Sequence, residues 1–381
     1  MKKICFVTTV SITVRAFLMP LIHYLDKNTD WELTVICDED PALKELLPEQ
    51  VRFIPVSMKR GISLRGIGAM MEMAKIFRRE KFDLVQYSTP NASLYASMAA
   101  KLAGVPVRLY CQWGIAYVGF QGMKRKVFKA VEKFVCKLST QIEPDSFGNL
   151  NFSHSEKLYS PQKSCVIWNG SASGVSLEKF DIGQKQQWRE QIRARLGIGE
   201  QSFVYGFIGR ITGDKGINEL FTAYQQLLQR QPDTYLILVG MAEKEETLEP
   251  ALYQWAKENS RVIFCGFSTE VEKYIAAMDV YILPSYREGF GSAVVEAEAM
   301  GVPVVISDIP GPRDAMVENV TGLVVKKADP ESLYEAMLQM KSDEALRQQL
   351  GEAAYELAKD KFEQKQLMNC IMQDRIRLMG G

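Results

Sequence analysis

Residues 284–305 have the sequence PSYREGFGSAVVEAEAMGVPVV. The run Val280–Leu283 directly before them is short, apolar and rich in strand-favouring residues, which predicts an interior strand of a parallel sheet. A Pro-Ser pair ends that strand. Ser292 is a good N-cap residue, and strong helix formers fill residues 293–300 after it. The stretch therefore predicts a strand, a glycine-containing loop and a helix, and the rest of the chain is interpreted around this unit.

Two carboxylates, Glu288 and Glu296, lie in this stretch with seven residues between them. A helix N-terminus carries unpaired N–H groups and a partial positive charge, which suits a phosphate. A phosphate would repel the carboxylates, so we expect them to accept hydrogen bonds from neutral hydroxyl groups. A phosphate flanked by hydroxyl-binding carboxylates indicates a nucleotide sugar. Taken alone, the spacing also fits a solvated loop residue followed by an acid that favours a helix start.

The length and charge of the chain indicate two different domains. At 381 residues it is too long for one ordinary hydrophobic core, and 47% hydrophobic with 24% charged residues is typical of a soluble globular protein. The formal net charge is zero, yet residues 1–150 contain 21 Lys and Arg against 14 Asp and Glu, and residues 52–137 contain 16 against 4. A basic first domain beside an acidic second one indicates an anionic surface as a partner of the first.

The seven cysteines are widely spaced, form no CxxC pair, and in several cases lie in apolar strand-like runs. We therefore expect a reducing cytosol, no disulfides and no zinc site. The basic and apolar N-terminus resembles a signal peptide, but Arg15 interrupts the apolar run and no small-residue cleavage site follows. Because no stretch of about 18 uninterrupted apolar residues occurs, the sequence predicts a protein that does not span a membrane.

Strand-like runs alternate with helical patterns, which predicts parallel sheets covered by helices on both faces and ligands at the carboxyl ends of the strands. The turn after the first strand, residues 8–15, has no glycine, which argues against a nicotinamide or flavin enzyme. Polar sequence at 183–195 predicts a domain boundary near residue 185, and we expect a helix at 362–379 to pack back across the first domain. The predicted strands are residues 4–9, 32–37, 52–56, 84–87, 107–111 and 165–168, then 204–208, 235–239, 262–264, 280–283, 302–306 and 322–325.

Residues 124–138 have the clearest amphipathic helix pattern in the chain. We interpret them as a helix that buries its apolar arc and leaves a basic face in solvent. That face would be attracted to anionic lipid by about 1 kcal/mol per basic residue near the surface. The apolar arc contains Val127, Phe128, Val131, Phe134, Val135 and Leu138, and the basic face contains Arg125, Lys126, Lys129, Lys133 and Lys137.

Arg210 and Lys215 lie in a second glycine-containing turn, residues 209–216, which follows a predicted strand and opens a helix. Arginine offers a fork of donors to phosphate oxygens, and lysine offers a mobile point charge. The turn is not a P-loop, since no Gly-Lys-Ser/Thr sequence occurs in it. The pair alone also fits solvated surface cations. Together with the carboxylates and Gly291 and Ser292 at the same predicted sheet edge, it favours a diphosphate site.

Further motifs extend this pattern and carry a family resemblance. They are Gly209-Arg210 with Lys215-Gly216, Glu288-Gly-Phe-Gly with Glu296, Met300-Gly-Val-Pro-Val, Asp308-Ile-Pro-Gly, and Asn319-Val-Thr-Gly-Leu-Val. Together these motifs resemble the family 4 retaining glycosyltransferases, which have the GT-B fold. The segment WNGSASGVSLEKF at residues 168–180 is similar to bacterial capsule, exopolysaccharide and lipopolysaccharide sugar transferases that act on lipid-diphosphate carriers.

The resemblance implies an α/β protein with two Rossmann-like, doubly wound parallel-sheet domains that face a cleft. Residues 1–185 would form the acceptor-binding domain, and residues 186–360 the nucleotide-sugar-binding domain. Residues 361–381 would form a C-terminal helix that returns to the first domain.

The resemblance also implies roles for individual residues. Arg210 and Lys215 would hold the donor diphosphate and neutralise the leaving group. Glu288 would contact the donor sugar and complete the catalytic set, and Glu296 would bind the ribose hydroxyls. The remaining donor contacts would come from the backbone of Phe290, Gly291 and Ser292.

The implied activity is retaining transfer of a hexosyl or N-acetylhexosaminyl group from a nucleotide diphosphate sugar, with a UDP-sugar as the leading candidate. The implied acceptor is a lipid-diphosphate-linked saccharide of surface polysaccharide biosynthesis. The resemblance implies no metal and no other cofactor. We expect a cytoplasmic, peripheral protein at the inner face of the cell membrane, with its basic first domain on anionic lipid and no nucleic-acid partner.

One departure from the family concerns the acceptor side. Members commonly have a His-Gly pair after the strand that corresponds to residues 107–111, whereas this chain has Gln112-Trp113-Gly114. The chain contains two histidines in total, and neither is a candidate replacement. Trp113, next to Gly114, is expected to stack on a sugar or to cover the acceptor cleft.

Two other functions stay open from the sequence. A nucleotide-sugar epimerase on the same fold uses acid/base side chains at the sugar, which the scarcity of histidine and the complete glutamate pair argue against. A catalytically degenerate scaffold that binds nucleotide sugar is suggested by Trp113, and the complete donor-side set argues against it.

Overall fold

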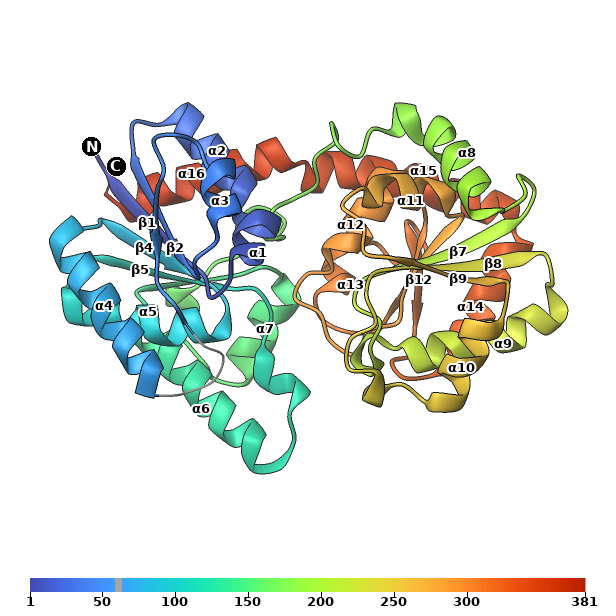
Figure 1. The fold of residues 1–381 in the computed structure, drawn as a ribbon, viewed down its shortest axis with the longest axis horizontal. Coiled ribbons are helices and arrows are strands. Elements are labelled where there is room, and N and C mark those ends of the chain that lie inside the picture. The colour runs from blue at the N-terminus through green and yellow to red at the C-terminus, as the bar shows by residue number, and fades with distance from the viewer. Residues whose placement is uncertain (59–63, 381) are drawn as a thin grey trace. The chain divides into compact units, whose positions relative to one another are not determined.

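The computed structural model describes residues 1–58 and 64–380, and this part of the chain folds into two compact units (Figure 1). The first unit contains Met1–Ser173 and Gln364–Gly381, and the second contains Gly174–Glu363. The division falls earlier than the predicted boundary near residue 185. The reason is local packing: the Val175 N–H donates to the Phe362 carbonyl oxygen at 2.8 Å, and Val175 is buried in the core of the second unit.

A parallel sheet with the strand order β3-β2-β1-β4-β5-β6 forms the centre of the first unit. Ile4 of β1 lies beside Leu33 of β2 on one side and Leu84 of β4 on the other. The chain order reverses between β1 and β4, and such reversal points are where these sheets bind ligands. The strands are β1 (Lys3–Val7), β2 (Glu32–Cys37), β3 (Arg52–Pro55), β4 (Leu84–Tyr87), β5 (Val107–Gln112) and β6 (Gln141–Pro144).

Alternate residues of these strands face opposite layers of helices (Figure 1). Cys5 and Val7 pack with α4, α5 and α6, whereas Ile4 and Phe6 pack with α2, α3 and α16. Both faces are apolar because helices cover both. The helices are α1 (Ser11–Thr13), a π-helical turn (Val14–Leu18), α2 (Met19–Asn28), α3 (Pro41–Leu46), α4 (Leu64–Glu80), α5 (Pro90–Ala103), α6 (Gly122–Leu138), α7 (Phe147–Ser155) and α16 (Gln364–Leu378).

The prediction that residues 165–168 form the last strand of this sheet is wrong, and β6 is the edge strand at that side. Those residues are not a strand, and next to them Ser164 forms only an isolated bridge with Ile142. The backbone then leaves the extended conformation, because Trp168 has a φ of 51°. The sequence did not predict β6, because its four residues, QIEP, contain no apolar run.

The second unit repeats the architecture with the strand order β12-β11-β10-β7-β8-β9, so its reversal point lies between β7 and β10. Helices surround this sheet as well (Figure 1). Helix α9 packs against α10 and α14, α8 packs against α11, and α12 packs against α15. The predicted α/β class, with two doubly wound parallel sheets, is confirmed. The strands are β7 (Phe203–Ile208), β8 (Thr234–Val239), β9 (Val262–Gly266), β10 (Val280–Leu283), β11 (Val304–Ser307) and β12 (Gly322–Val325). The helices are α8 (Lys185–Leu196), α9 (Ile217–Arg230), α10 (Pro250–Glu258), α11 (Val271–Ala277), α12 (Ser292–Ala299), α13 (Pro312–Ala315), α14 (Pro330–Ser342) and α15 (Glu344–Phe362).

Helix α6 buries less of its apolar arc than its pattern predicts. Val135 is buried and Val131 is half-buried, but Val127 and Phe134 are 47% and 42% exposed. The prediction that these two side chains are buried is wrong. The main helical neighbour of α6 among the described residues is α5, which leaves part of the apolar arc of α6 uncovered. Among the helices of residues 1–58 and 64–380, none is long and apolar enough to cross a bilayer.

A buried ion-pair network holds α16 in the first unit. Arg375 is 1% exposed, and its Nη1 lies 2.5 Å from Glu143 Oε2 and 2.8 Å from Asp374 Oδ2. Its Nε and Nη2 donate to Gln86 Oε1 at 3.3 and 3.1 Å. Burial alone would lower the pKa of Arg375, but the charge and hydrogen bond of Glu143 and the charge of Asp374 together outweigh it, and the pKa lies above its usual value. The guanidinium therefore joins the helix to β4 and β6.

Arg375→Met is expected to lower the free energy of unfolding by about 3–5 kcal/mol, because it leaves buried Glu143 without its cation and leaves Asp374 with Arg377 alone. Urea denaturation measures the change. Arg377→Met on the same helix is the matched control, since the Arg377 side chain is 61% exposed. The control should lose no more than about 1 kcal/mol. Equal losses in the two variants would contradict the assigned role of the network.

Candidate functional site

The two turns that carry the predicted donor residues lie side by side in the second unit. Lys215 Nζ lies 2.5 Å from Glu288 Oε1, and the Ser285 hydroxyl donates to the same oxygen at 2.6 Å. Lys215 follows β7, whereas Ser285 and Glu288 follow β10, and these strands are neighbours where the chain order reverses. The fold therefore brings a cation and a carboxylate together at the position where α/β sheets bind ligands.

The close approach of these turns depends on Gly216. Its φ is 71°, and an added Cβ would lie 2.0 Å from the Pro284 carbonyl oxygen. Both the left-handed backbone and the lack of space require glycine. Gly216 is also the residue from which α9 begins, so the partial positive charge of that helix N-terminus lies beside the Lys215–Glu288 pair.

Arg210 lies in the same turn and is partly exposed. Its Nη1 is 3.6 Å from Glu243 Oε2, and its Nη2 is 4.0 Å from Asp214 Oδ2. Asp214 also accepts a hydrogen bond from the Thr212 hydroxyl at 2.6 Å and pairs with Arg287 at 3.1 Å. Burial opposes ionisation of Asp214, but the Thr212 hydroxyl and the Arg287 and Arg210 charges outweigh it and lower the pKa of the carboxyl. Asp214 therefore stays ionised and organises the cations of this turn.

The start of α12 differs from its prediction. The cap residue is Gly291, whose φ is 90°, and no side chain caps this end within the described residues. The prediction of Ser292 as the N-cap is therefore wrong, because the turn needs a positive φ and Ser292 is already helical. Phe290 is buried and its ring centroid lies 5.4 Å from that of Phe362, so only its backbone can face a ligand.

Glu296 has surroundings different from those of Glu288. It is half-buried on α12, and burial raises the pKa of its carboxyl, with the Glu272 charge adding to the effect and the Lys179 charge opposing it. Lys179 Nζ lies 3.6 Å from Glu272 Oε2 and donates to the Thr269 carbonyl at 3.2 Å. The sequence reasoning missed Lys179 and Glu272, since nothing in their spacing connects them with α12.

Other missed residues follow strand ends at the same edge of the sheet. Met241 is 55% exposed directly after Gly240, and Phe267 is 69% exposed directly after Gly266. They follow β8, which pairs with β7, and β9, which pairs with β8 at the edge of the sheet. Such exposed apolar side chains offer flat surfaces beside the polar cluster. The sequence signal that could have identified Met241 and Phe267 is a large apolar residue directly after a glycine at the end of a strand.

The predicted acceptor-side residues, Trp113 and Gly114, follow β5 in the first unit. Trp113 is half-buried, and its ring centroid lies 5.4 Å from that of Phe17. At the reversal point of this sheet, the Thr9 and Thr89 hydroxyl oxygens lie 2.8 Å apart. Thr89 has a φ of 69°, which is rare for a β-branched residue and typical of functional positions. Sequence reasoning missed this pair because each threonine looked like an ordinary strand end.

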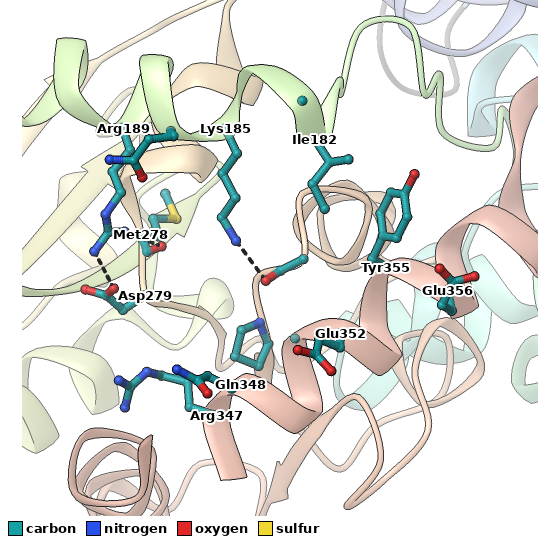
Figure 2. Close-up of a pocket in the computed structure, with 15 residues that line it drawn as sticks. Ile182, Lys185, Arg189, Met278, Asp279, Arg347, Gln348, Glu352, Tyr355 and Glu356 are labelled. Atoms are coloured by element: carbon teal, nitrogen blue, oxygen red, sulfur yellow. Dashed lines mark hydrogen bonds and ion pairs between the residues drawn. The ribbon is translucent and has the colours of Figure 1, made fainter. Parts of the chain in front are cut away.

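A pocket of about 800 Å³ in the second unit lies at the opposite edge of the sheet, next to the amino ends of β10 and β11 (Figure 2). Lys185 donates to the Gly301 carbonyl at 2.9 Å, and Arg189 pairs with Asp279 at 2.7 Å. Burial lowers the pKa of Lys185 to about 8. These contacts tie α8 to the loops before β10 and β11. The predicted donor residues do not line this pocket.

Two family models match this chain. The family described as "Glycosyl transferase 4-like" matches residues 3–146, and the family described as "Glycosyl transferases group 1" matches residues 188–357. The chain belongs to the glycosyltransferases. The second match contains both turns of the donor cluster, and the first contains the acceptor-side residues.

Relatives of this glycosyltransferase include enzymes of bacterial surface polysaccharides. It is 28% identical over 362 residues to the capsular polysaccharide biosynthesis glycosyltransferase CapM of Staphylococcus aureus, covering 95% of this chain and 93% of that protein. It is also 28% identical to the UDP-Gal:alpha-D-GlcNAc-diphosphoundecaprenol alpha-1,3-galactosyltransferase of Escherichia coli, covering 86% of this chain and 87% of that one. The crystal structure of Anabaena Alr3699/HepE with UDP and glucose matches with a TM-score of 0.80 over 98% of this chain and 99% of that chain, at 20% identity. That likeness shows the fold, which is the predicted GT-B fold.

Gly216→Ala is expected to destabilise the glycosyltransferase more than Gly197→Ala. Both glycines have left-handed φ values, 71° and 68°, so either substitution should cost about 1–2 kcal/mol of backbone strain. At Gly216 the new Cβ also meets the Pro284 carbonyl, whereas around Gly197 the described residues leave open space. Urea midpoints of the two variants measure the difference, and equal midpoints would show that the close approach is not required.

Proposed function

We propose that this chain is a retaining glycosyltransferase that moves a hexosyl or N-acetylhexosaminyl group from a UDP-sugar to a lipid-diphosphate-linked saccharide. The observation that carries this proposal is the contact of Lys215 with Glu288 at the reversal point of the second sheet, with Arg210 exposed in the same turn. A diphosphate needs cations and a sugar needs hydroxyl-binding carboxylates, and this cluster offers both. The name of the Escherichia coli relative, with its UDP-sugar donor and diphosphoundecaprenol acceptor, supports the same classes of substrate in surface polysaccharide biosynthesis.

In the proposed reaction the bond between the anomeric carbon of the donor and its diphosphate oxygen breaks. Arg210 and Lys215 neutralise the charge that develops on the departing UDP, and the N-terminus of α12 adds to this effect. When the diphosphate engages Lys215, Glu288 is freed from its ion pair to accept hydrogen bonds from the sugar. The backbone of Phe290, Gly291 and Ser292 completes the sugar and phosphate contacts.

Two further features of the proposed reaction concern its substrates. Glu296 binds the ribose hydroxyls, and its raised pKa fits a carboxyl that lies away from solvent. The acceptor binds the first unit near Trp113 and Gly114. Its hydroxyl oxygen bonds to the anomeric carbon on the face that the diphosphate leaves, and the hydroxyl proton passes to the departing diphosphate oxygen, so the anomeric configuration is retained.

Arg210→Ala and Lys215→Ala are each expected to lower kcat/KM by about 100-fold or more, because each removes a cation that stabilises the leaving group. The assay supplies UDP-galactose and, in parallel, UDP-N-acetylglucosamine with N-acetylglucosaminyl-diphosphoundecaprenol, and measures UDP release and labelled lipid. Arg230→Ala, at the far end of α9, is the matched control and should keep full activity.

Several outcomes of this assay would contradict the proposed function. Unchanged turnover in both variants would remove the assigned donor site. NMR of the product would show an inverted anomeric centre if the mechanism were not retaining. Interconversion of the donor sugar without acceptor would identify an epimerase, and tight donor binding without transfer would identify a scaffold.

We propose in addition that the first unit contacts the cytoplasmic, anionic face of the cell membrane through α6. Met123, Val127 and Phe134 are 72%, 47% and 42% exposed on this helix. A hollow of about 510 Å³ beside Phe134 has a mainly apolar lining with three lysines at its edge. Exposed apolar residues among lysines are what an anionic lipid surface binds. The lysines of the hollow are Lys133, Lys137 and Lys163.

The double variant Val127→Ser/Phe134→Ser is expected to bind phosphatidylglycerol-containing vesicles about tenfold more weakly, because it removes apolar contact area. Sedimentation with vesicles measures the bound fraction, which should also fall at high salt. Val317→Ser/Val320→Ser is the matched control, since these residues of the second unit are 43% and 48% exposed. Equal effects of the two double variants, or equal binding to neutral phosphatidylcholine vesicles, would contradict this contact.

A further inference from the structure

A small, largely enclosed pocket of about 40 Å³ lies inside the first unit, between α5, α6 and the end of β5. Its wall includes the Ser93 side chain of α5, the Glu132 side chain of α6 and Tyr110 of β5. Pro90 and Asn91, in the first turn of α5, place it at the carboxyl ends of β4 and β5. This edge contains the reversal point of the sheet, so the pocket lies where a ligand of this unit is expected.

Of the two carboxylate oxygens of Glu132, Oε1 accepts two hydrogen bonds and Oε2 accepts none from the described residues. Tyr110 donates to Oε1 at 2.9 Å, and Gln112 Nε2 donates to the same oxygen at 2.6 Å. The Gln112 amide is itself fixed, because its Oε1 accepts hydrogen bonds from Ser153 at 3.0 Å and Tyr159 at 2.9 Å. No donor among the described residues reaches Glu132 Oε2. Burial raises the pKa of Glu132, and its bonds with Gln112 and Tyr110 partly oppose this.

Ser93 supplies a second unused polar group in the same pocket. Its side chain is 1% exposed, and its Oγ has no hydrogen-bond partner among the described residues. Buried hydroxyl groups are normally hydrogen-bonded, so an exception calls for a partner from outside the chain. A buried hydroxyl of Ser93 and a half-buried carboxylate of Glu132, both with unused hydrogen-bonding capacity, line one small hollow and indicate a polar guest.

We infer that this pocket receives one hydroxyl or hydroxymethyl group of the acceptor saccharide, held by Glu132 Oε2 and Ser93 Oγ. The guest is neutral, because a carboxyl in an apolar wall disfavours phosphate and carboxylate groups. The pocket is far too small for a sugar ring, so it selects one substituent of the ring. The apolar wall of the pocket is formed by Phe128, Val131 and Val135, and its shape limits which ring substituent can enter. This inference rests on the proposed transferase function and names one determinant of its acceptor specificity.

Ser93→Ala gives the sharpest test, because it removes only the hydroxyl with no partner in the chain. It should raise the acceptor KM by about 3- to 10-fold and leave kcat, the donor KM and the melting temperature unchanged. Ser97→Ala is the matched control one turn further along α5: Ser97 is equally buried, but it does not line the pocket and its hydroxyl donates to the Leu94 carbonyl. The acceptor is N-acetylglucosaminyl-diphosphoundecaprenol, assayed with its deoxy analogues.

Glu132→Gln provides an independent variant, since it keeps Oε1 for Tyr110 and Gln112 and replaces only Oε2. It should raise the acceptor KM by about 10-fold, and one deoxy analogue should be a poor acceptor for the wild type but equal to the parent acceptor for Ser93→Ala. If Ser93→Ala leaves the acceptor KM unchanged, as Ser97→Ala should, the guest is a permanent water and the inference is wrong. A wild type that binds UDP-sugar but transfers to none of these acceptors also overturns it. Failure to bind UDP-sugar would instead overturn the proposed function first.

Discussion

The second unit is organised around one close approach of backbone, where Gly216 faces the Pro284 carbonyl. Only a residue without a Cβ lets the turns after β7 and β10 meet there. Their meeting brings Lys215 within 2.5 Å of Glu288, although the two residues are far apart in the sequence. The parallel sheet sets this up, because its chain order reverses between these strands and the following helices leave in different directions. The donor chemistry proposed for this cluster depends on that geometry.

The two units share an architecture but differ in the chemistry of their ligand edges. The edge of the second unit carries an ion-pair cluster in which Asp214 holds cations in place, which suits a charged diphosphate. The corresponding edge of the first unit carries hydroxyl groups, a strained Thr89 and a half-buried carboxyl, which suit a neutral saccharide. Basic residues gather instead on α6, among exposed apolar side chains. The proposed donor, acceptor sugar and lipid surface call for three different surfaces, and the described residues offer a candidate for each.

The sequence predicted most of the fold because parallel strands buried on both faces are continuous apolar runs, such as Val280–Leu283. It missed β6, whose QIEP sequence has no such run, and misplaced the cap of α12, where backbone φ at Gly291 outweighs the capping ability of Ser292. Burial of Val127 and Phe134 was overestimated, because periodicity shows which residues share a face and not whether another element covers it. The pairing of Lys215 with Glu288 could be predicted from strand order and motif. The Glu132–Gln112 network could not, since it depends on tertiary contacts among two helices, a strand and the loop after α7.

A crystal structure with UDP bound tests the central claim most directly. We expect diphosphate oxygens within hydrogen-bond distance of Lys215 Nζ and the Arg210 guanidinium, with the ribose hydroxyls on Glu296. We also expect Lys215 to move from Glu288 toward the phosphate. A diphosphate bound elsewhere, for example in the pocket beside Lys185 at the opposite edge of the sheet, would contradict the account.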